Sequence, residues 1–185
     1  MKRFACLLLV IFLAGCSEGA GAIERGMALR SRLLSGESCM FDAEITADYG
    51  ENLYVFELSC EGNNKGDISF TVKSPESIAG ITGKIDREGG KLTFDDTVLH
   101  FELMADDQIS PISAPWILLK TLRSGYLRAA GMEEDLLRLT IDDTYEEDAL
   151  QLDIWLGAGD LPVRCEMLYA DRRILSLDVT NFRIQ

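Results

Sequence analysis

Short runs in which apolar and polar residues alternate fill most of this chain from residue 39 onward, and they constrain the fold more than any other feature. Turn residues such as Gly89-Gly90 and Asp95-Asp96 separate consecutive runs. Short consecutive strands joined by tight turns pair as an antiparallel sheet. The predicted strands are residues 39–47, 54–60, 68–72, 81–85, 92–94, 99–103, 137–141, 150–156, 163–169 and 175–184.

Two segments have helical rather than alternating patterns. In residues 23–34 the side chains of Ile23, Met27 and Leu34 are spaced to share one face. In residues 113–128, Ser113 is a candidate N-cap, Pro115 suits the first turn, and the rest is apolar around most of its circumference. A large sheet cannot bury one apolar face alone, so the second helix is predicted to cover it.

These elements predict a single domain of the mostly β, α+β class over residues 23–185. Its core would be a large curved antiparallel sheet, a half-open barrel of about eight to ten strands, covered by the two helical segments. The chain has no internal repeat and no change of composition that would mark a second domain.

The first sixteen residues have the pattern of a secretory signal. Lys2 and Arg3 precede an apolar run that ends in small residues. Residues 13–16, Leu-Ala-Gly-Cys, resemble the bacterial lipobox, which implies cleavage of a signal peptide at residues 1–15, acylation (palmitate) of Cys16 and a lipidated tether at 16–22. The protein would then be extracytoplasmic and anchored to the bacterial membrane through acylated Cys16. The alternative is an ordinary signal peptide in which Cys16 is not acylated.

The acidic charge limits the partners of the mature chain. Removal of residues 1–15 takes away two of the 18 basic residues and leaves 16 against 31 acidic ones, a net charge of −15. Nucleic acid requires a cationic surface, so the sequence predicts no nucleic-acid binding. The predicted contact with the membrane is therefore through the lipid anchor.

Three cysteines remain once Cys6, inside the signal, and Cys16, the anchor, are set aside. A two-residue hairpin loop at positions 49 and 50 would place Cys39 opposite Cys60, and we expect a disulfide between them. The same register makes one face of the hairpin apolar, pairing Phe41 with Leu58, Ala43 with Phe56 and Ile45 with Tyr54. Cys165 is predicted to be a buried, small apolar residue.

A second hairpin can be registered in the same way. A two-residue loop at Asp95-Asp96 sets Phe94 against Thr97 and Leu92 against Leu99.

The residue patterns of the common catalytic chemistries are missing. The chain has no Gly-x-Ser-x-Gly, His-Glu-x-x-His, Walker or Gly-x-Gly-x-x-Gly motif, and its sole histidine, His100, lies in a predicted strand. Carboxylates are abundant, above all in residues 142–148, and could hold calcium or hydrolyse glycosides. A solvated turn between two strands explains them as well. We therefore predict no catalytic residue, metal site or cofactor.

Two groups of residues are candidates for binding. Trp116, Leu119, Leu122 and Tyr126 of the second helical segment could close over a hydrophobic ligand, or could be ordinary core. In the first helix, Arg25, Arg30 and Arg32 could rest on anionic lipid head groups, or could form a solvated face.

The closing residues carry a resemblance to a known group. An alternating strand at 150–156, a Gly-rich turn, the sequence Leu-Pro-Val-Arg at 161–164 and the pair Asn181-Phe182 in the last strand resemble the LolA/LppX-like lipoprotein carriers. The resemblance implies a half-open antiparallel barrel whose apolar concave face receives acyl chains. Related members bind partner proteins of the envelope instead.

The sequence thus favours a membrane-anchored, non-catalytic lipoprotein that binds a lipid, acyl chain or other hydrophobic ligand as a carrier or acceptor. The alternative is an envelope protein-binding or sensory module of the same fold with no ligand cavity. A small hydrolase is a third class, supported only by the abundance of carboxylates.

Overall fold

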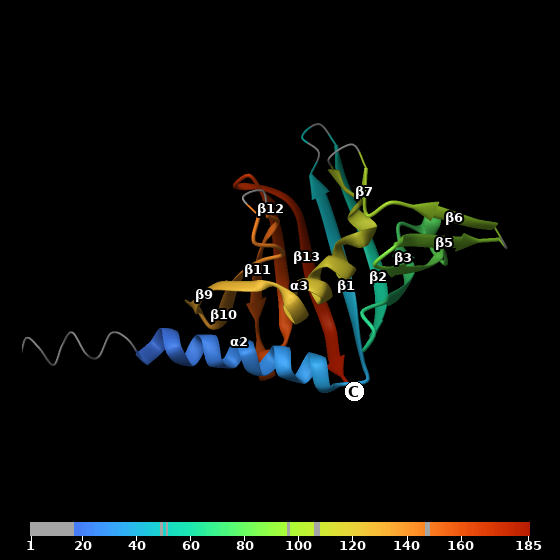
Figure 1. Cartoon of the computed structure of the whole chain (residues 1–185). Helices are drawn as coiled ribbons and strands as arrows, with labels where there is room; N and C mark the ends of the chain where they lie inside the picture. The colour runs from blue at the N-terminus through green and yellow to red at the C-terminus, as the bar shows by residue number, and fades with distance from the viewer. Residues whose placement is uncertain (1–16, 49, 51, 96, 106–107, 147–148) are drawn as a thin grey trace, which may run out of the picture.

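The computed structural model describes residues 17–48, 50, 52–95, 97–105, 108–146 and 149–185. It is mostly β: eleven strands form one antiparallel sheet that is not closed, and two α-helices accompany it (Figure 1). The strands of this sheet are β1 Ser38–Asp48, β2 Leu53–Asn63, β3 Ile68–Ser74, β4 Thr82–Asp86, β5 Gly89–Phe94, β6 Thr97–Phe101, β9 Tyr126–Glu133, β10 Leu136–Asp142, β11 Gln151–Leu156, β12 Pro162–Tyr169 and β13 Arg172–Ile184.

The helices are α2 (Ser17–Ser35) and α3 (Ala114–Ser124). The structure also has three short 3₁₀ turns, η1 (Glu76–Ile78), η2 (Pro111–Ser113) and η3 (Ala158–Asp160). The short strands β7 (Met104–Ala105) and β8 (Gln108–Ile109) form a separate two-stranded ladder. In the described part of the chain, no helix is both long enough and apolar enough to cross a membrane.

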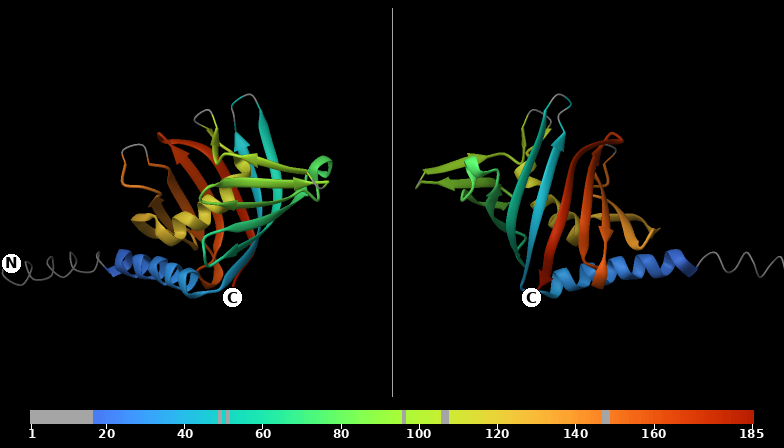
Figure 2. Two further views of the ribbon diagram at one scale, coloured as in Figure 1. Left: turned by 45° about the vertical axis from the view of Figure 1, so that its right-hand side comes forward. Right: turned by 180° about the vertical axis from the view of Figure 1, so that it is seen from behind.

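The first and last strands lie together in the middle of the sheet. The strand order is β6-β5-β4-β3-β2-β1-β13-β12-β11-β10-β9, so β1 pairs with β2 on one side and with β13 on the other. Figure 2 shows the sheet curving around α3, while α2 lies across one end of the sheet. The fold class predicted from the sequence, a large open antiparallel sheet with two helices, is confirmed.

The core lies between the concave face of the sheet and α3. Alternate residues of each central strand point inward and are buried, and almost every residue of α3 from Ala114 to Leu122 is buried as well. Gly62 of β2 allows the closest approach, because a Cβ atom there would lie only 2.5 Å from Cδ1 of Leu119. The strands and α3 therefore form one continuous apolar core.

The register of the β1–β2 hairpin differs from the predicted one by two residues. Phe41, not Cys39, lies opposite Cys60, and Cys39 lies opposite Gly62. The loop has four residues, 49–52, because Asp48 pairs with Leu53. A shift of two residues leaves the same side chains on the same face, so the apolar pattern could not distinguish the two registers.

In this register Cys39 and Cys60 are not directly opposite, and no disulfide joins them in this structure. Cys39, Cys60 and Cys165 are all buried free cysteines. Burial raises the pKa of each thiol above its ordinary value, which disfavours the reactive thiolate. The expectation that Cys165 is a buried apolar residue is confirmed.

These thiols give a direct test of the register. In non-acylated protein, we expect dithionitrobenzoate to react with none of Cys39, Cys60 and Cys165 in the native state, and with all three in guanidinium chloride. A Cys39–Cys60 disulfide detected by mass spectrometry in protein purified without reductant would contradict the four-residue loop.

Both helices differ from their predicted bounds. Helix α2 begins at Ser17 and so includes residues expected to form a tether. Helix α3 ends at Ser124, because the chain turns extended at Gly125 and enters strand β9 at Tyr126. The predicted helix included residues 126–128 and no strand was predicted at residues 129–133, which is why the sheet has eleven strands rather than eight to ten.

Candidate ligand-binding site

The predicted ligand-binding residues lie on two different elements. Trp116, Leu119 and Leu122 are buried on α3. Tyr126 is half-buried at the start of β9, in the sheet rather than on the helix. Three of the four predicted residues therefore lie on α3, and the fourth lies on strand β9.

Hydrogen bonds from two side chains of α3 hold it against the β2–β3 turn. The Nε1 atom of Trp116 donates to the carbonyl oxygen of Gly66 at 2.9 Å, and Nη1 of Arg123 donates to that of Asn63, also at 2.9 Å. Both acceptors lie at the turn between β2 and β3. Helix α3 is therefore fastened to the β2–β3 turn along one side.

Arg30 of α2 caps the C-terminal end of α3. Its Nε donates to the carbonyl oxygen of Leu122 at 2.8 Å, and its Nη2 donates to that of Gly125 at 2.7 Å. A cation is favourable at a helix C-terminus, where the last carbonyl groups lack intrahelical partners. Partial burial lowers the pKa of this guanidinium. Arg30 thereby links the two helices.

Trp116, Leu119 and Leu122 belong to the buried apolar core between α3 and the sheet. The two best-defined hollows among the described residues have volumes of about 840 Å³ and 690 Å³. Neither is lined by a residue of α3. These two hollows therefore lie away from the candidate ligand residues Trp116, Leu119 and Leu122.

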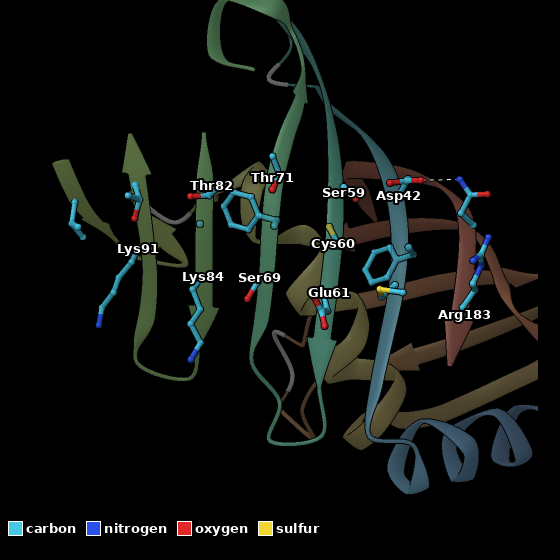
Figure 3. Close-up of a pocket in the computed structure, with 17 residues that line it drawn as sticks. Asp42, Ser59, Cys60, Glu61, Ser69, Thr71, Thr82, Lys84, Lys91 and Arg183 are labelled. Atoms are coloured by element: carbon cyan, nitrogen blue, oxygen red, sulfur yellow. Dashed lines mark hydrogen bonds between the residues drawn. The ribbon is translucent and has the colours of Figure 1, made fainter. Parts of the chain in front are cut away.

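The larger hollow lies on the opposite, outer face of the sheet and was not anticipated (Figure 3). Its charged residues are Asp42, Glu61, Lys84, Lys91 and Arg183, and its hydroxyl groups come from Ser59, Ser69, Thr71, Thr82 and Thr93. Outward positions rich in Ser and Thr on adjacent strands were the only sequence signal for it, and solvated strands show the same pattern.

Some of these charges are already paired. Nζ of Lys84 lies 2.9 Å from Oδ2 of Asp67, whose pKa is lowered by this hydrogen bond and by a second one from Asn63. Asn181 donates to Oδ2 of Asp42 at 2.8 Å. By contrast, no ion pair among the described residues includes Lys91 or Arg183 of the hollow.

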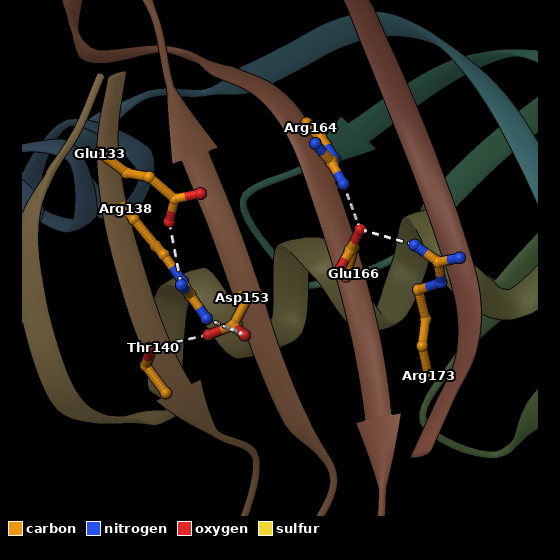
Figure 4. A network of polar contacts seen from close by, with 7 residues as sticks. All are labelled: Glu133, Arg138, Thr140, Asp153, Arg164, Glu166 and Arg173. Carbon is orange, nitrogen blue, oxygen red and sulfur yellow. Dashed lines mark hydrogen bonds and ion pairs between the residues drawn. The ribbon is translucent and has the colours of Figure 1, made fainter. Parts of the chain in front are cut away.

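A second polar cluster lies on the outer face of β10 and β11 (Figure 4). Asp153 is 3% exposed, accepts a hydrogen bond from Thr140 Oγ1 at 2.7 Å, and forms an ion pair with Nη2 of Arg138 at 2.7 Å. Glu133 pairs with the same guanidinium at 2.9 Å. Each oxygen of Asp153 has a partner, so its burial is compensated.

Trp155 lies beside this cluster and is sandwiched by two arginines. The guanidinium carbons of Arg138 and Arg164 lie 5.3 Å and 4.6 Å from the centre of its ring. The ring is only 5% exposed although it is on the outer face and outside the main core. The apolar stems of the arginines supply the cover that a packed layer would otherwise give.

Glu166 forms ion pairs with Arg164, which also covers Trp155, and with Arg173 (Figure 4). Burial alone would raise the pKa of its carboxyl, but the hydrogen bonds from the two arginines outweigh this and the pKa is lowered. A lowered pKa means that the ionised form stabilises the folded state.

This shift predicts a pH-dependent contribution to stability. At pH 7 we expect Glu166→Gln to lower the free energy of unfolding by about 0.5–1 kcal/mol, since the arginines are half exposed. The difference should be complete above the ordinary glutamate pKa of about 4.3 and vanish as the pH falls through the lower folded-state value. Urea titrations between pH 7 and pH 3 measure it. Glu102→Gln, at an exposed residue in no ion pair of the described chain, should show no such loss.

His100 and the acidic run at residues 142–148 were the residues considered for catalysis or metal binding. His100 is exposed on β6, opposite Lys91. No group of three or more His, Cys, Asp or Glu within the described ranges is arranged to hold a metal ion. In the acidic run, Oδ1 of Asp143 accepts the N–H of Leu150 at 2.8 Å, which is the role of a carboxylate that closes a turn. Residues 96, 106–107 and 147–148 lie outside the described residues.

The three arginines of α2 point to the protein itself, which corrects the idea that they rest on lipid head groups. Arg25 forms an ion pair with Asp160 at 2.5 Å, and Arg32 donates to the carbonyl oxygens of Gly159 and Asp160 at 3.0 Å. Arg30 caps α3. The predicted lipidation residue, Cys16, lies outside the described residues.

The fold is that of an open antiparallel half-barrel that curves around a helix. The chain is structurally similar to a protein of the LolA superfamily and to the lipoprotein LppX. No protein-family model and no curated protein matches the sequence.

Three solved structures illustrate the similarity. A LolA superfamily protein from Nitrosomonas europaea shares 8% identity over 86% of this chain and 93% of its own, with a TM-score of 0.45. For LppX from Mycobacterium tuberculosis the values are 10%, 88%, 93% and 0.42. An uncharacterized conserved protein from Thermus thermophilus shares 10% identity over 86% of both chains, with a TM-score of 0.48.

Proposed function

We propose that this protein is a non-catalytic lipoprotein, anchored outside the cytoplasm by acyl chains on Cys16, that binds a hydrophobic ligand between the sheet and α3. The observation that carries the proposal is the position of α3. This helix is buried around nearly its whole circumference, yet it covers the concave face of a sheet that is not closed. The ligand class is a lipid or acyl chain, which would take the place of α3 side chains against the apolar strands.

The apolar contacts of α3 with the sheet support its displacement, and the hydrogen bonds made by Trp116, Arg123 and Arg30 would have to break for it to move. Its contacts with the sheet are mostly apolar, and apolar contacts are non-directional, so those of a ligand can substitute for them. The Oγ1 atom of Thr121 is buried on α3 without a hydrogen-bond partner among the described residues. An unsatisfied buried hydroxyl costs about 1–3 kcal/mol, which reduces the free energy needed to move the helix away.

A disulfide that locks α3 to β1 tests the proposal. Leu119 and Cys39 both lie against Gly62, since a Cβ atom there would be 2.5 Å from Leu119 Cδ1 and 3.1 Å from Cys39 Sγ. Leu119→Cys therefore brings a second thiol toward Cys39. In a Cys60→Ala background, we expect the reduced protein to bind a fluorescent fatty acid and the oxidised protein to lose this binding.

The matched control is Leu119→Ala in the same background, which has no second thiol and should bind the fatty acid equally well with and without oxidant. Mass spectrometry of the oxidised variant confirms the Cys39 linkage. The carrier proposal fails if the reduced Leu119→Cys protein and the unmodified protein both leave fatty acids and phospholipids unbound.

A second candidate function is a protein-binding module of the cell envelope, with no ligand cavity. The specific observation in its favour is that the hollow of about 840 Å³ lies on the outer face of the sheet and is lined by no residue of α3. A photo-crosslinking amino acid at Thr71, within that hollow, should then capture one stoichiometric protein partner in intact cells. The same probe at Ser124, an exposed residue of α3, is the control.

A further inference from the structure

Helix α2 has an exposed apolar stripe in addition to its buried face. The buried face consists of Ala22, Gly26, Leu29 and Leu33, and the small residues allow a close approach: a Cβ atom at Gly26 would lie 2.9 Å from Leu139 Cδ2. The three large side chains predicted to share one face do so, but they point outward: Ile23, Met27 and Leu34 are 47%, 45% and 60% exposed.

The spacing of these residues makes them a continuous surface. At about 100° per residue, positions 23, 27 and 34 fall within an arc of about 40°. Arg30 lies at the edge of this arc but turns to the C-terminal end of α3. The stripe is thus apolar along more than three helical turns, on the flank of α2 next to α3.

The position of α2 in the chain indicates what covers the stripe. The helix begins at Ser17, the residue directly after Cys16. It lies on the outside of the domain, across one end of the sheet (Figures 1 and 2). Acyl chains on Cys16 would hold the first turn of α2 at the bilayer surface, and Ile23, the first residue of the stripe, follows about 10 Å along the helix.

The charge of α2 agrees with a lipid surface. Its two acidic residues, Glu18 and Glu24, are outnumbered by three arginines, which gives the helix a net charge of +1. The mature chain carries −15, so the remainder carries −16. Bacterial membranes contain anionic lipids, and α2 does not share the acidic excess of the rest of the chain, which would oppose contact with them.

We infer that α2 lies in the plane of the bilayer, with Ile23, Met27 and Leu34 inserted at the boundary between head groups and acyl chains. This inference rests on the proposed acylation of Cys16. Helices with one apolar and one polar face bind in this orientation, and the buried apolar area adds to the anchor. The contact also fixes the orientation of the domain, because Arg30 ties α2 to α3.

An environment-sensitive probe on acylated protein tests the inference. Met27→Cys is labelled with nitrobenzoxadiazole and reconstituted in vesicles of phosphatidylethanolamine and phosphatidylglycerol. Ala28→Cys is the matched control, because it is exposed on the other side of the same helix turn. Cys39, Cys60 and Cys165 are buried and should remain unlabelled.

We expect the emission of the probe at position 27 to shift to the blue and to be quenched by nitroxide-labelled lipids, with neither change at position 28. Equal, water-like emission at both positions in protein that floats with the vesicles overturns the inference and leaves the anchor intact. Failure to float overturns both. A disulfide dimer of Met27→Cys formed in detergent without vesicles overturns it in favour of a second copy of this chain.

Discussion

Replacement of Trp155 by alanine is expected to lower the free energy of unfolding by about 3–5 kcal/mol, although this side chain lies outside the main core. The ring is 5% exposed and is covered by Arg138 and Arg164. Its removal exposes the adjoining strands and ends both cation–π contacts, each worth about 0.5–2 kcal/mol. Guanidinium titration monitored by circular dichroism measures the change.

Two further variants separate the contributions at this position. Trp155→Phe keeps most of the buried area and should cost less than half as much as alanine. Val98→Ala removes an outward-facing apolar side chain that is 52% exposed, and should change stability by less than about 0.5 kcal/mol. If Trp155→Ala were as mild as Val98→Ala, the arginine sandwich would contribute nothing to the fold.

The second large effect is expected at the centre of α3. Leu118 is fully buried against the sheet, so Leu118→Ala should destabilise the protein by about 2–5 kcal/mol through lost burial and a residual cavity. The same free-energy measurement applies. Ser124→Ala, at an exposed residue of the same helix, should remain within about 0.5 kcal/mol of the unmodified protein.

This variant also distinguishes the two functions. If α3 leaves the sheet when a ligand binds, weaker packing of α3 should increase the affinity for fatty acids, because less free energy opposes the open state. If the concave face is a closed core, Leu118→Ala should lower stability with no gain in fatty-acid binding.

Much of the fold could be predicted because strand alternation is a local signal. The β5–β6 hairpin has the predicted register, with Phe94 opposite Thr97 and Leu92 opposite Leu99. The β1–β2 register was wrong because a shift of two residues preserves every inward side chain. Strand β9 was missed because its first residues, Tyr126 and Leu127, continue the apolar pattern of α3, and because none of its residues is fully buried.

The candidate site was predictable only in part. The sequence identified Trp116, Leu119 and Leu122 as apolar helix residues, but whether they enclose a cavity depends on packing across the whole sheet. For α2, the spacing predicted that Ile23, Met27 and Leu34 share one face but not whether that face is buried. The protein buries Ala22 and Gly26, with Gly26 against Leu139 of β10, and leaves Ile23 and Met27 exposed.

The pairing of β1 with β13 has a consequence for biogenesis. The central ladder joins residues almost 150 positions apart, for example Cys39 with Ile184. Strands β2–β6 and β9–β12 can form as local meanders, but the two halves have no strand-to-strand connection until the last segment of the chain is available. Long-range pairing of this kind slows folding. A chain exported from its N-terminus would therefore complete its sheet only after the C-terminal residues had crossed the membrane.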